Sequence, residues 1–122
     1  MALQLKRAYD PPSQDDGARY LVERRWPRGV TKEALALTAW LKDIAPSTEL
    51  RRWYGHDPER WPEFQRRYKR ELDAPDKRDA LEELARASRS GPATLVFAAR
   101  DADHSSATVL KRFLEARTPA RR

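Results

Sequence analysis

The residues best suited to chemistry follow a short apolar run, in the segment Leu21–Gly29. This segment reads L-V-E-R-R-W-P-R-G, so a glutamate, three arginines and a tryptophan stand close together. Pro27 fixes its own φ angle and favours extended geometry at Trp26, which predicts that a strand ends there. Gly29 permits a sharp exit that a residue with a Cβ would resist. The sequence therefore predicts a stiff turn that presents charged side chains at the end of a strand.

Two arginines of this segment, Arg24 and Arg28, bracket the turn, so both guanidinium groups could bind one phosphate or carboxylate group. Arginine suits this role because its planar fork makes paired hydrogen bonds to such anions. Trp26 lies between them and could stack on a ligand ring. The alternative is structural: one arginine pairs with Glu23 or Asp43 and braces the turn.

A second candidate group follows the apolar run Thr94–Ala99, which is typical of a central strand covered on both faces. Ser105 and Ser106 open a helix there, and the free N–H groups of a helix start attract anions. Plain capping of the helix is the alternative. Asp101 could act with Glu23 as a carboxylate pair in acid–base chemistry, or each could form a salt bridge with an arginine.

Composition limits the other kinds of chemistry. The chain has 122 residues, a net charge of +6 and a pI near 10.0, which favours anionic partners. The absence of cysteine excludes disulfides, thiol catalysis and cysteine metal sites. His56 and His104 are isolated, so we expect them to be turn and loop residues rather than bases, with no metal site. No cofactor motif is present, and we expect no cofactor.

The chain carries no signal peptide and no apolar run near the ~20 residues that a membrane span needs. These features predict a soluble, cytoplasmic protein with no membrane partner. We expect one domain over residues 1–117, followed by a basic tail at 118–122.

Three segments have strand patterns: residues 2–9, 18–24 and 94–99. Helical signals follow Thr31 (a helix carrying Leu35, Ala39 and Trp40), cover Thr48–Tyr54, restart near Pro62, and bury Leu81, Leu84, Val109 and Leu110. The first connection, Asp10–Gly17, is shorter than a usual parallel crossover, and taken alone it favours a hairpin. The second and last strands are joined by helices and should lie parallel. The pattern predicts an α/β fold with a small, three-stranded, mostly parallel sheet and four to five helices.

Several stretches resemble one family closely. They read K-R-A-Y-D at Lys6–Asp10, D-G-A-R-Y-L-V-E-R-R-W-P-R-G at Asp16–Gly29, W-L-K-D-I-A-P-S-T-E-L-R at Trp40–Arg51, W-Y-G-H-D-P-E-R-W at Trp53–Trp61, F-Q-R-R-Y-K-R-E-L at Phe64–Leu72 and T-L-V-F-A-A-R-D at Thr94–Asp101. On these residues the chain resembles the YeaO-like family, part of domain-of-unknown-function family 488. The resemblance implies a compact bacterial-type α/β domain and no established activity. It also favours a parallel first strand, against the hairpin, because longer relatives place a helix between the first two strands.

The chain departs from this family's pattern at two of the candidate groups. Where relatives usually have V-D-R-L-W, this chain has Val22-Glu23-Arg24-Arg25-Trp26, so the carboxylate is one methylene longer. Where relatives usually have Asn-His-Ala at the start of the last helix, it has Ser105-Ser106-Ala107. Because the family's histidine is missing at that point, the resemblance gives no support there for a mechanism that depends on a histidine.

In parallel sheets of this kind, ligands bind outside the carboxyl ends of the strands. We therefore predict a site there for a small phosphate- or carboxylate-bearing ligand, with nucleotides among the candidates. The predicted ligand-binding residues are Tyr9, Arg24, Trp26, Arg28, Asp101 and Ser105. Two alternatives remain open: a nucleic-acid-binding module that uses surface arginines, and a homo-oligomeric interaction domain with an exposed stripe over Trp61–Tyr68. The sequence names no catalytic residue and leaves enzyme activity undecided.

Overall fold

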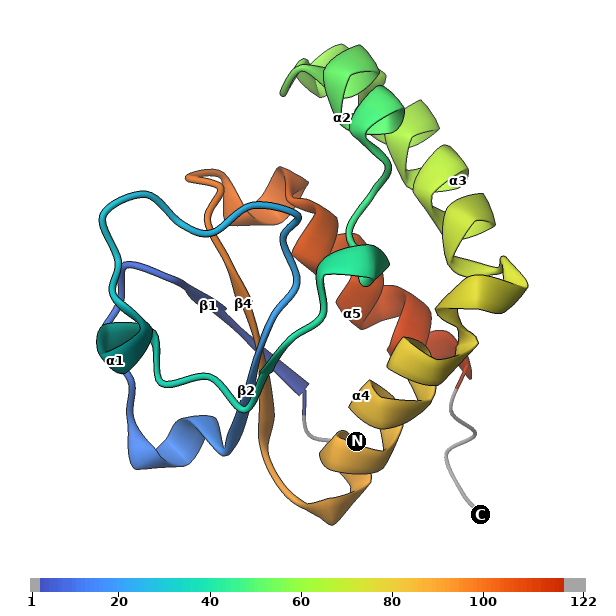
Figure 1. Cartoon of the computed structure of the whole chain (residues 1–122). Coiled ribbons are helices and arrows are strands. Elements are labelled where there is room, and N and C mark those ends of the chain that lie inside the picture. The colour runs from blue at the N-terminus through green and yellow to red at the C-terminus, as the bar shows by residue number, and fades with distance from the viewer. Residues whose placement is uncertain (1–2, 118–122) are drawn as a thin grey trace.

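The structure is a computed structural model that describes residues 3–117. Within these residues a four-stranded, wholly parallel sheet has the strand order β1-β4-β2-β3. Figure 1 labels the first three of these strands. The strands are β1 (Leu3–Arg7), β2 (Ala18–Leu21), β3 (Ala39–Trp40) and β4 (Ala93–Phe97). The α/β class and the parallel sheet are confirmed, but the prediction of three strands is wrong by one. The predicted tail at 118–122 lies outside the described residues.

The additional strand is β3, which the sequence analysis placed inside a helix starting after Thr31. That helix is only the short α1 (Lys32–Leu35), because Ala36 adopts a left-handed conformation with φ 49°. The chain then pairs with the edge of β2, where the Thr38 N–H donates to the Arg19 carbonyl at 2.7 Å. Edge pairing of the backbone outweighs the helical pattern here, because a buried strand edge needs hydrogen-bond partners.

The first strand lies parallel to β4, so the hairpin is wrong and the family resemblance was right. The connection from Ala8 to Gly17 has ten residues, which span up to about 33 Å when extended. Because β1 has only five residues, about 16 Å, this connection can return along the sheet without a full helix. It carries one short turn of 3-10 helix, Gln14–Asp16.

Four longer helices complete the fold: α2 (Thr48–Tyr54), α3 (Trp61–Leu72), α4 (Arg78–Ser90) and α5 (Ser106–Arg117). The predicted bounds of α2 are confirmed. Its start is capped by the Ser47 hydroxyl, which accepts from the Leu50 N–H at 3.1 Å, and Gly55 ends it with φ 51°. Pro62 stands in the first turn of α3, where the missing N–H costs little. The expected restart at this proline is therefore confirmed.

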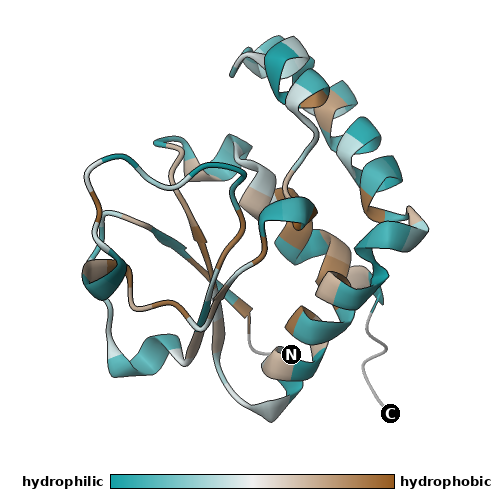
Figure 2. Ribbon diagram, viewed as in Figure 1, coloured by the Kyte–Doolittle hydropathy of each residue, from teal (hydrophilic) through white to brown (hydrophobic). Residues whose placement is uncertain are grey.

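The main core lies between one face of the sheet and the long helices (Figure 2). Leu95 and Phe97 of β4 point into it, and α3 contributes Phe64, Tyr68 and Leu72, each at most 2% exposed. The aromatic stripe of α3 is thus buried, so the prediction that it forms an exposed oligomer face is wrong. Within residues 3–117 no helix is long and apolar enough to cross a membrane.

The opposite face of the sheet is covered by α1 and the irregular chain around it rather than by long helices. A small buried cluster there contains Leu21, Leu35 and Val96, with Trp26 and Trp40 packed against it. Successive residues of β2 and β4 point to opposite faces, so both clusters are built from the same two central strands. The carboxyl ends of these strands are consequently held from both sides.

Candidate functional site

A cavity of about 310 Å³ lies at the carboxyl edge of the sheet. Its walls come from segments far apart in sequence: the ends of β2 and β4, the α2 helix with the turn after it, α3, and the start of α5. The lining residues are Glu23, Pro46, Arg51, Tyr54, His56, Phe64, Ala98, Ala99, His104, Ser105 and Ser106. The cavity therefore stands where the sequence predicted a ligand site.

The sheet side of the cavity is held by two side chains. Glu23, just beyond β2, accepts a hydrogen bond at Oε2 from the Ala98 N–H at 2.9 Å. Arg7 approaches from β1 and donates from Nε to the Ala99 carbonyl at 3.1 Å. The Glu23 carbonyl in turn accepts from Trp40 Nε1 at 2.6 Å. These bonds fix the backbone that leaves β4 and keep the Glu23 carboxylate at the cavity wall.

The start of α5 forms a second wall. The Ser105 hydroxyl donates to the Ala102 carbonyl at 3.0 Å and accepts from the Thr108 N–H at 3.4 Å, so Ser105 caps the helix. Ser106 and Ala107 are the first two helical residues, and N–H groups at these positions have no carbonyl partner within the helix. The helix start thus presents backbone donors beside the cavity.

His104 lies beside this helix start and is fixed by three contacts. Its Nδ1 is 2.7 Å from Asp101 Oδ2, and its ring meets the Trp61 ring edge-on, with centroids 5.1 Å apart. Its carbonyl accepts from the Tyr54 hydroxyl at 3.0 Å. The hydrogen bond from His104 lowers the pKa of Asp101, which therefore stays ionised. Burial raises the pKa of Tyr54, and nearby Asp101 adds to that rise, so Tyr54 stays protonated.

The third wall carries Arg51 and His56. Both are exposed, and neither side chain makes a hydrogen bond or ion pair within residues 3–117. His56 follows Gly55 and has φ 58°, a left-handed conformation that is uncommon outside glycine. This turn brings the His56 ring to 5.8 Å from the Tyr54 ring. Two basic side chains are therefore left free on the cavity rim.

The apolar part of the cavity is aromatic. The Tyr54 and Phe64 rings stack with centroids 4.3 Å apart and an interplanar angle of 22°. Both residues are buried, so only part of each ring borders the cavity. The cavity thus combines an aromatic wall with a basic rim and a carboxylate.

Of the six predicted ligand-binding residues, Ser105 lines this cavity. Arg24 is not among the lining residues; it donates from Nε to the Pro46 carbonyl at 2.7 Å and from Nη2 to the Ala45 carbonyl at 3.2 Å. Its nearest carboxylate oxygen, on the exposed Asp43, is 3.9 Å from Nη1. Arg24 therefore ties the end of β2 to the segment before α2.

The remaining predicted residues lie outside the cavity lining. Arg28 is exposed, and within the described part of the chain it makes no hydrogen bond or ion pair. Trp26 packs edge-on against Trp40 at 5.5 Å and donates from Nε1 to the Val30 carbonyl. Tyr9 is 48% exposed beside the Arg7 guanidinium, and Asp101 acts through its bond to His104. Gly29 has φ 77°, as a sharp turn there requires.

Sequence reasoning missed Arg51 and the two histidines as cavity residues. The spacing of Asp101 and His104 was the available signal, since residues three apart meet in a helical turn. Residues Ala102–His104 form such a turn of 3-10 helix. For His56 the signal was weaker, namely a polar residue just after a helix-ending glycine.

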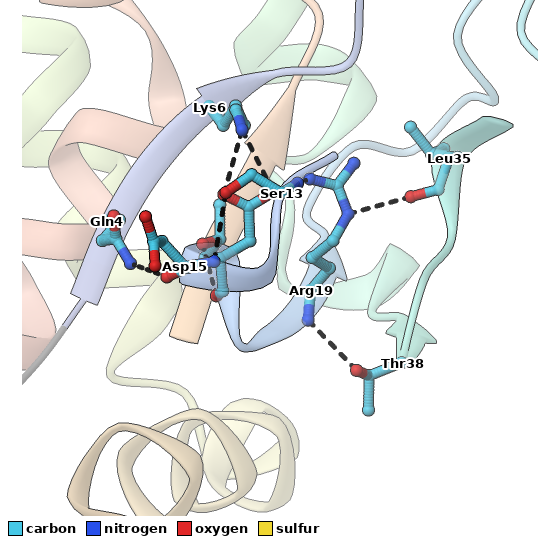
Figure 3. Close-up of polar contacts among 9 residues, drawn as sticks. Gln4, Lys6, Ser13, Asp15, Arg19, Leu35 and Thr38 are labelled. Carbon is cyan, nitrogen blue, oxygen red and sulfur yellow. Dashed lines mark hydrogen bonds and ion pairs between the residues drawn. The ribbon is translucent and has the colours of Figure 1, made fainter. Parts of the chain in front are cut away.

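A second charged cluster lies at the opposite, amino edge of the sheet (Figure 3). Asp16 and Arg19 are 5% and 3% exposed, and Arg19 Nη1 donates to Asp16 Oδ2 at 2.6 Å. Lys6 donates to the same carboxylate at 3.0 Å, as does the Ser13 N–H. Arg19 also donates from Nε to the Leu35 carbonyl at 2.9 Å, and its backbone N–H donates to Thr38. The cluster ties the first connection to α1 and the chain before β3.

Hydrogen bonds decide the ionisation of Asp16. Burial alone would raise its pKa, but the bonds from Lys6, from the Ser13 N–H and from Arg19 outweigh burial and lower the pKa. The carboxylate is therefore charged in the folded protein and fully occupied by donors. At this edge the charged groups of Asp16 and Arg19 are buried and bonded within the fold, except that Nη2 of Arg19 has no hydrogen-bonding partner among the described residues.

The sequence profile of a family described as "Inactive DUF488-N3 subclade" matches residues 2–122. The uncharacterized protein YeaO of Escherichia coli is 40% identical over 114 residues, which cover 93% of this chain and 97% of that protein. The chain belongs to the YeaO-like DUF488 family. The resemblance seen in the sequence motifs is thereby confirmed.

Other YeaO-like relatives occur in mycobacteria. Uncharacterized proteins of Mycobacterium tuberculosis (Rv3073c) and Mycobacterium bovis (Mb3100c) are each 42% identical over 115 residues, or 94% of this chain and 95% of theirs. No solved structure matches this YeaO-like chain.

Proposed function

We propose that the cavity at the carboxyl edge binds a small ligand bearing a phosphate or carboxylate group. One observation carries this proposal: Arg51, His56 and the start of α5 border the same cavity. Free basic side chains and helix-start N–H groups both favour an anion. The location adds support, since parallel α/β sheets bind ligands outside the carboxyl ends of their strands.

The volume of the cavity and its other lining residues limit the size and the chemical groups of the ligand. A volume of about 310 Å³ is at the lower end of small-molecule sites, which favours a ligand no larger than a mononucleotide. The stacked rings of Tyr54 and Phe64 suit a flat apolar group. Glu23 keeps Oε1 free of protein partners within residues 3–117, so it can accept from an N–H or O–H of the ligand. A nucleotide has an anion, a flat ring and such donors.

The description of the matching family favours ligand binding without catalysis over an enzymatic role. The subclade whose profile matches is described as inactive. We therefore assign the cavity a binding role.

The alternative, nucleic-acid binding through surface arginines, has less support. Arg66 and Arg67 of α3 both pair with Glu63, at 2.8 and 2.9 Å. Arg60 lies 3.7 Å from an oxygen of Asp57. These acidic partners weaken the positive field that phosphate backbones require.

Thermal melts with inorganic phosphate and with a nucleoside monophosphate, at constant ionic strength, test the cavity. A ligand that binds only the folded state raises the melting temperature. Arg51→Gln should reduce that rise, whereas Arg52→Gln should not, because Arg52 is exposed on the same helix but does not line the cavity. The proposal fails if neither ligand raises the melting temperature, or if both variants respond alike.

A further inference from the structure

The Asp101–His104 pair sets the chemistry of one cavity wall. His104 lines the cavity, whereas Asp101, which holds its Nδ1 at 2.7 Å, does not. With Nδ1 bonded to Asp101, Nε2 is the ring nitrogen that has no hydrogen-bonding partner within residues 3–117. The perpendicular Trp61 ring and the bond from Tyr54 to the His104 carbonyl hold this orientation.

The hydrogen bond to Asp101 also selects the tautomer of His104. An ionised carboxylate only accepts, so the imidazole keeps its proton on Nδ1. In the neutral ring Nε2 then carries a lone pair and has no hydrogen to donate. A phosphate or carboxylate oxygen beside that lone pair would be repelled. The same oxygen beside an imidazolium would receive a charge-assisted hydrogen bond.

We propose that anion binding in this cavity is coupled to the uptake of one proton by His104, with Asp101 as its positioning residue. The proton comes from solvent and goes to Nε2, which then donates to the anion. This inference rests on the proposed function, because it states how the same cavity holds its ligand. Affinity for a dianion should consequently increase as the pH falls through the neutral range.

Other charged and titratable groups surround His104, and they differ in their ordinary pKa. Its own segment carries Asp101 and Asp103, the end of β2 carries Glu23, and α2 with the turn after it carries Arg51, Tyr54, His56 and Asp57. The packed residues Trp61 and Phe64 of α3 do not titrate. Among these residue types, histidine is the one that changes charge near neutral pH. His56 lines the same cavity and is therefore the competing source of a bound proton.

Calorimetry with inorganic sulfate tests the coupling, since sulfate does not itself titrate near neutral pH. Titrations at one pH in two buffers of different ionisation enthalpy give the number of protons taken up. At about pH 8, above the usual range of a histidine side chain, we expect wild type to take up protons when it binds sulfate. At about pH 5, below the usual range of a histidine side chain, the uptake should be much smaller.

Three variants assign the proton. His104→Gln keeps an amide donor but cannot titrate, so it should bind sulfate without proton uptake and with a flat pH profile. His56→Gln should weaken sulfate binding, because it removes a rim residue, but the sulfate that still binds should keep its proton uptake. Asp101→Asn should lower the pH at which affinity falls, because the imidazolium loses its carboxylate partner. This shift would not arise if Asp101 only supported the fold.

The outcomes separate the two proposals. Sulfate binding with no proton uptake, or uptake that survives in His104→Gln and is lost in His56→Gln, overturns the coupling and leaves the anion site intact. Absence of binding by sulfate and by the ligands of the thermal melts overturns the site and the coupling together. A melting temperature for each variant without sulfate shows whether it is folded.

Discussion

The two edges of the sheet use charged residues in opposite ways. At the amino edge, Asp16 and Arg19 are almost fully buried and are bonded to each other and to the backbone. At the carboxyl edge, Arg51 and His56 are exposed, and within the described residues their side chains have no hydrogen-bonding partner. The first set joins chain segments, whereas the second set borders a cavity. The two edges therefore differ in the exposure and the bonding of their charged side chains rather than in the presence of charge.

Arg24 lies near the carboxyl edge, but its side chain is bonded to the backbone, as that of Arg19 is at the amino edge. Its guanidinium group donates hydrogen bonds to the carbonyls of Ala45 and Pro46. The anion clamp considered for Arg24 and Arg28 would need both groups free, and only Arg28 is exposed and unbonded within residues 3–117. Substitutions of buried, bonded charged residues should therefore change stability more than substitutions of exposed ones.

The largest effect is expected for Asp16→Ala. Removing this carboxylate leaves Arg19 buried without its ion-pair partner, which costs about 3–5 kcal/mol of unfolding free energy. Asp15→Ala is the matched control, since Asp15 is adjacent but exposed, and should change stability by no more than about 0.5 kcal/mol. Urea unfolding measures both. A cost for Asp16→Ala as small as that of Asp15→Ala would contradict the structural role of the cluster.

A second effect of the same carboxylate is its dependence on pH. Because the pKa of Asp16 is lower in the folded state than in the unfolded state, its contribution is present above the unfolded pKa and is lost as the pH falls through the folded pKa. Wild type should therefore lose stability on acidification below about pH 4, and Asp16→Asn should lose less. Urea melts over an acid pH series test this. Equal slopes for both proteins would show that another carboxylate dominates.

A smaller loss is expected for Arg24→Ala. Two charge-assisted hydrogen bonds disappear from a side chain that is 25% exposed, and the expected cost is roughly 2 kcal/mol. Sulfate should still raise the melting temperature of this variant as it does that of wild type, because Arg24 does not line the cavity. A stable Arg24→Ala that no longer responds to sulfate would restore Arg24 as an anion ligand.

The smallest effect is expected for Arg28→Ala, which removes an exposed side chain with no hydrogen bond or ion pair inside the described range. Its stability should stay within about 0.5 kcal/mol of wild type. The sulfate response in thermal melts should also be unchanged. Loss of that response would move the anion site towards the turn at Gly29.

Much of the fold was predictable because local signals and tertiary packing agree. Ser47 and Gly55 mark the ends of α2, and the apolar run at β4 is buried on both faces. β3 was not predictable, because its two residues become a strand through pairing with β2 rather than through any pattern of their own.

The position of the cavity was more predictable than its lining residues. The carboxyl edge follows from strand direction, and Ser105 follows from the start of the last helix. The orientation of Arg24 depends on where the Ala45 and Pro46 carbonyls lie, and these are twenty-one and twenty-two residues away in the chain. The role of His104 depends on the turn that brings it to Asp101. Such contacts depend on the backbone path, which local sequence patterns do not specify.

The most direct test of the account is a ¹⁵N–¹H NMR titration of the full chain with inorganic phosphate, with the ionic strength held constant by chloride. We expect the amide signals of Ala98, Ser105 and Ser106 to shift with a single saturating curve, while those of Asp16 and Arg19 stay in place. Saturating shifts at the amino edge or around Arg28, with none at the start of α5, would contradict the proposal that the carboxyl edge binds the anion and the amino edge does not.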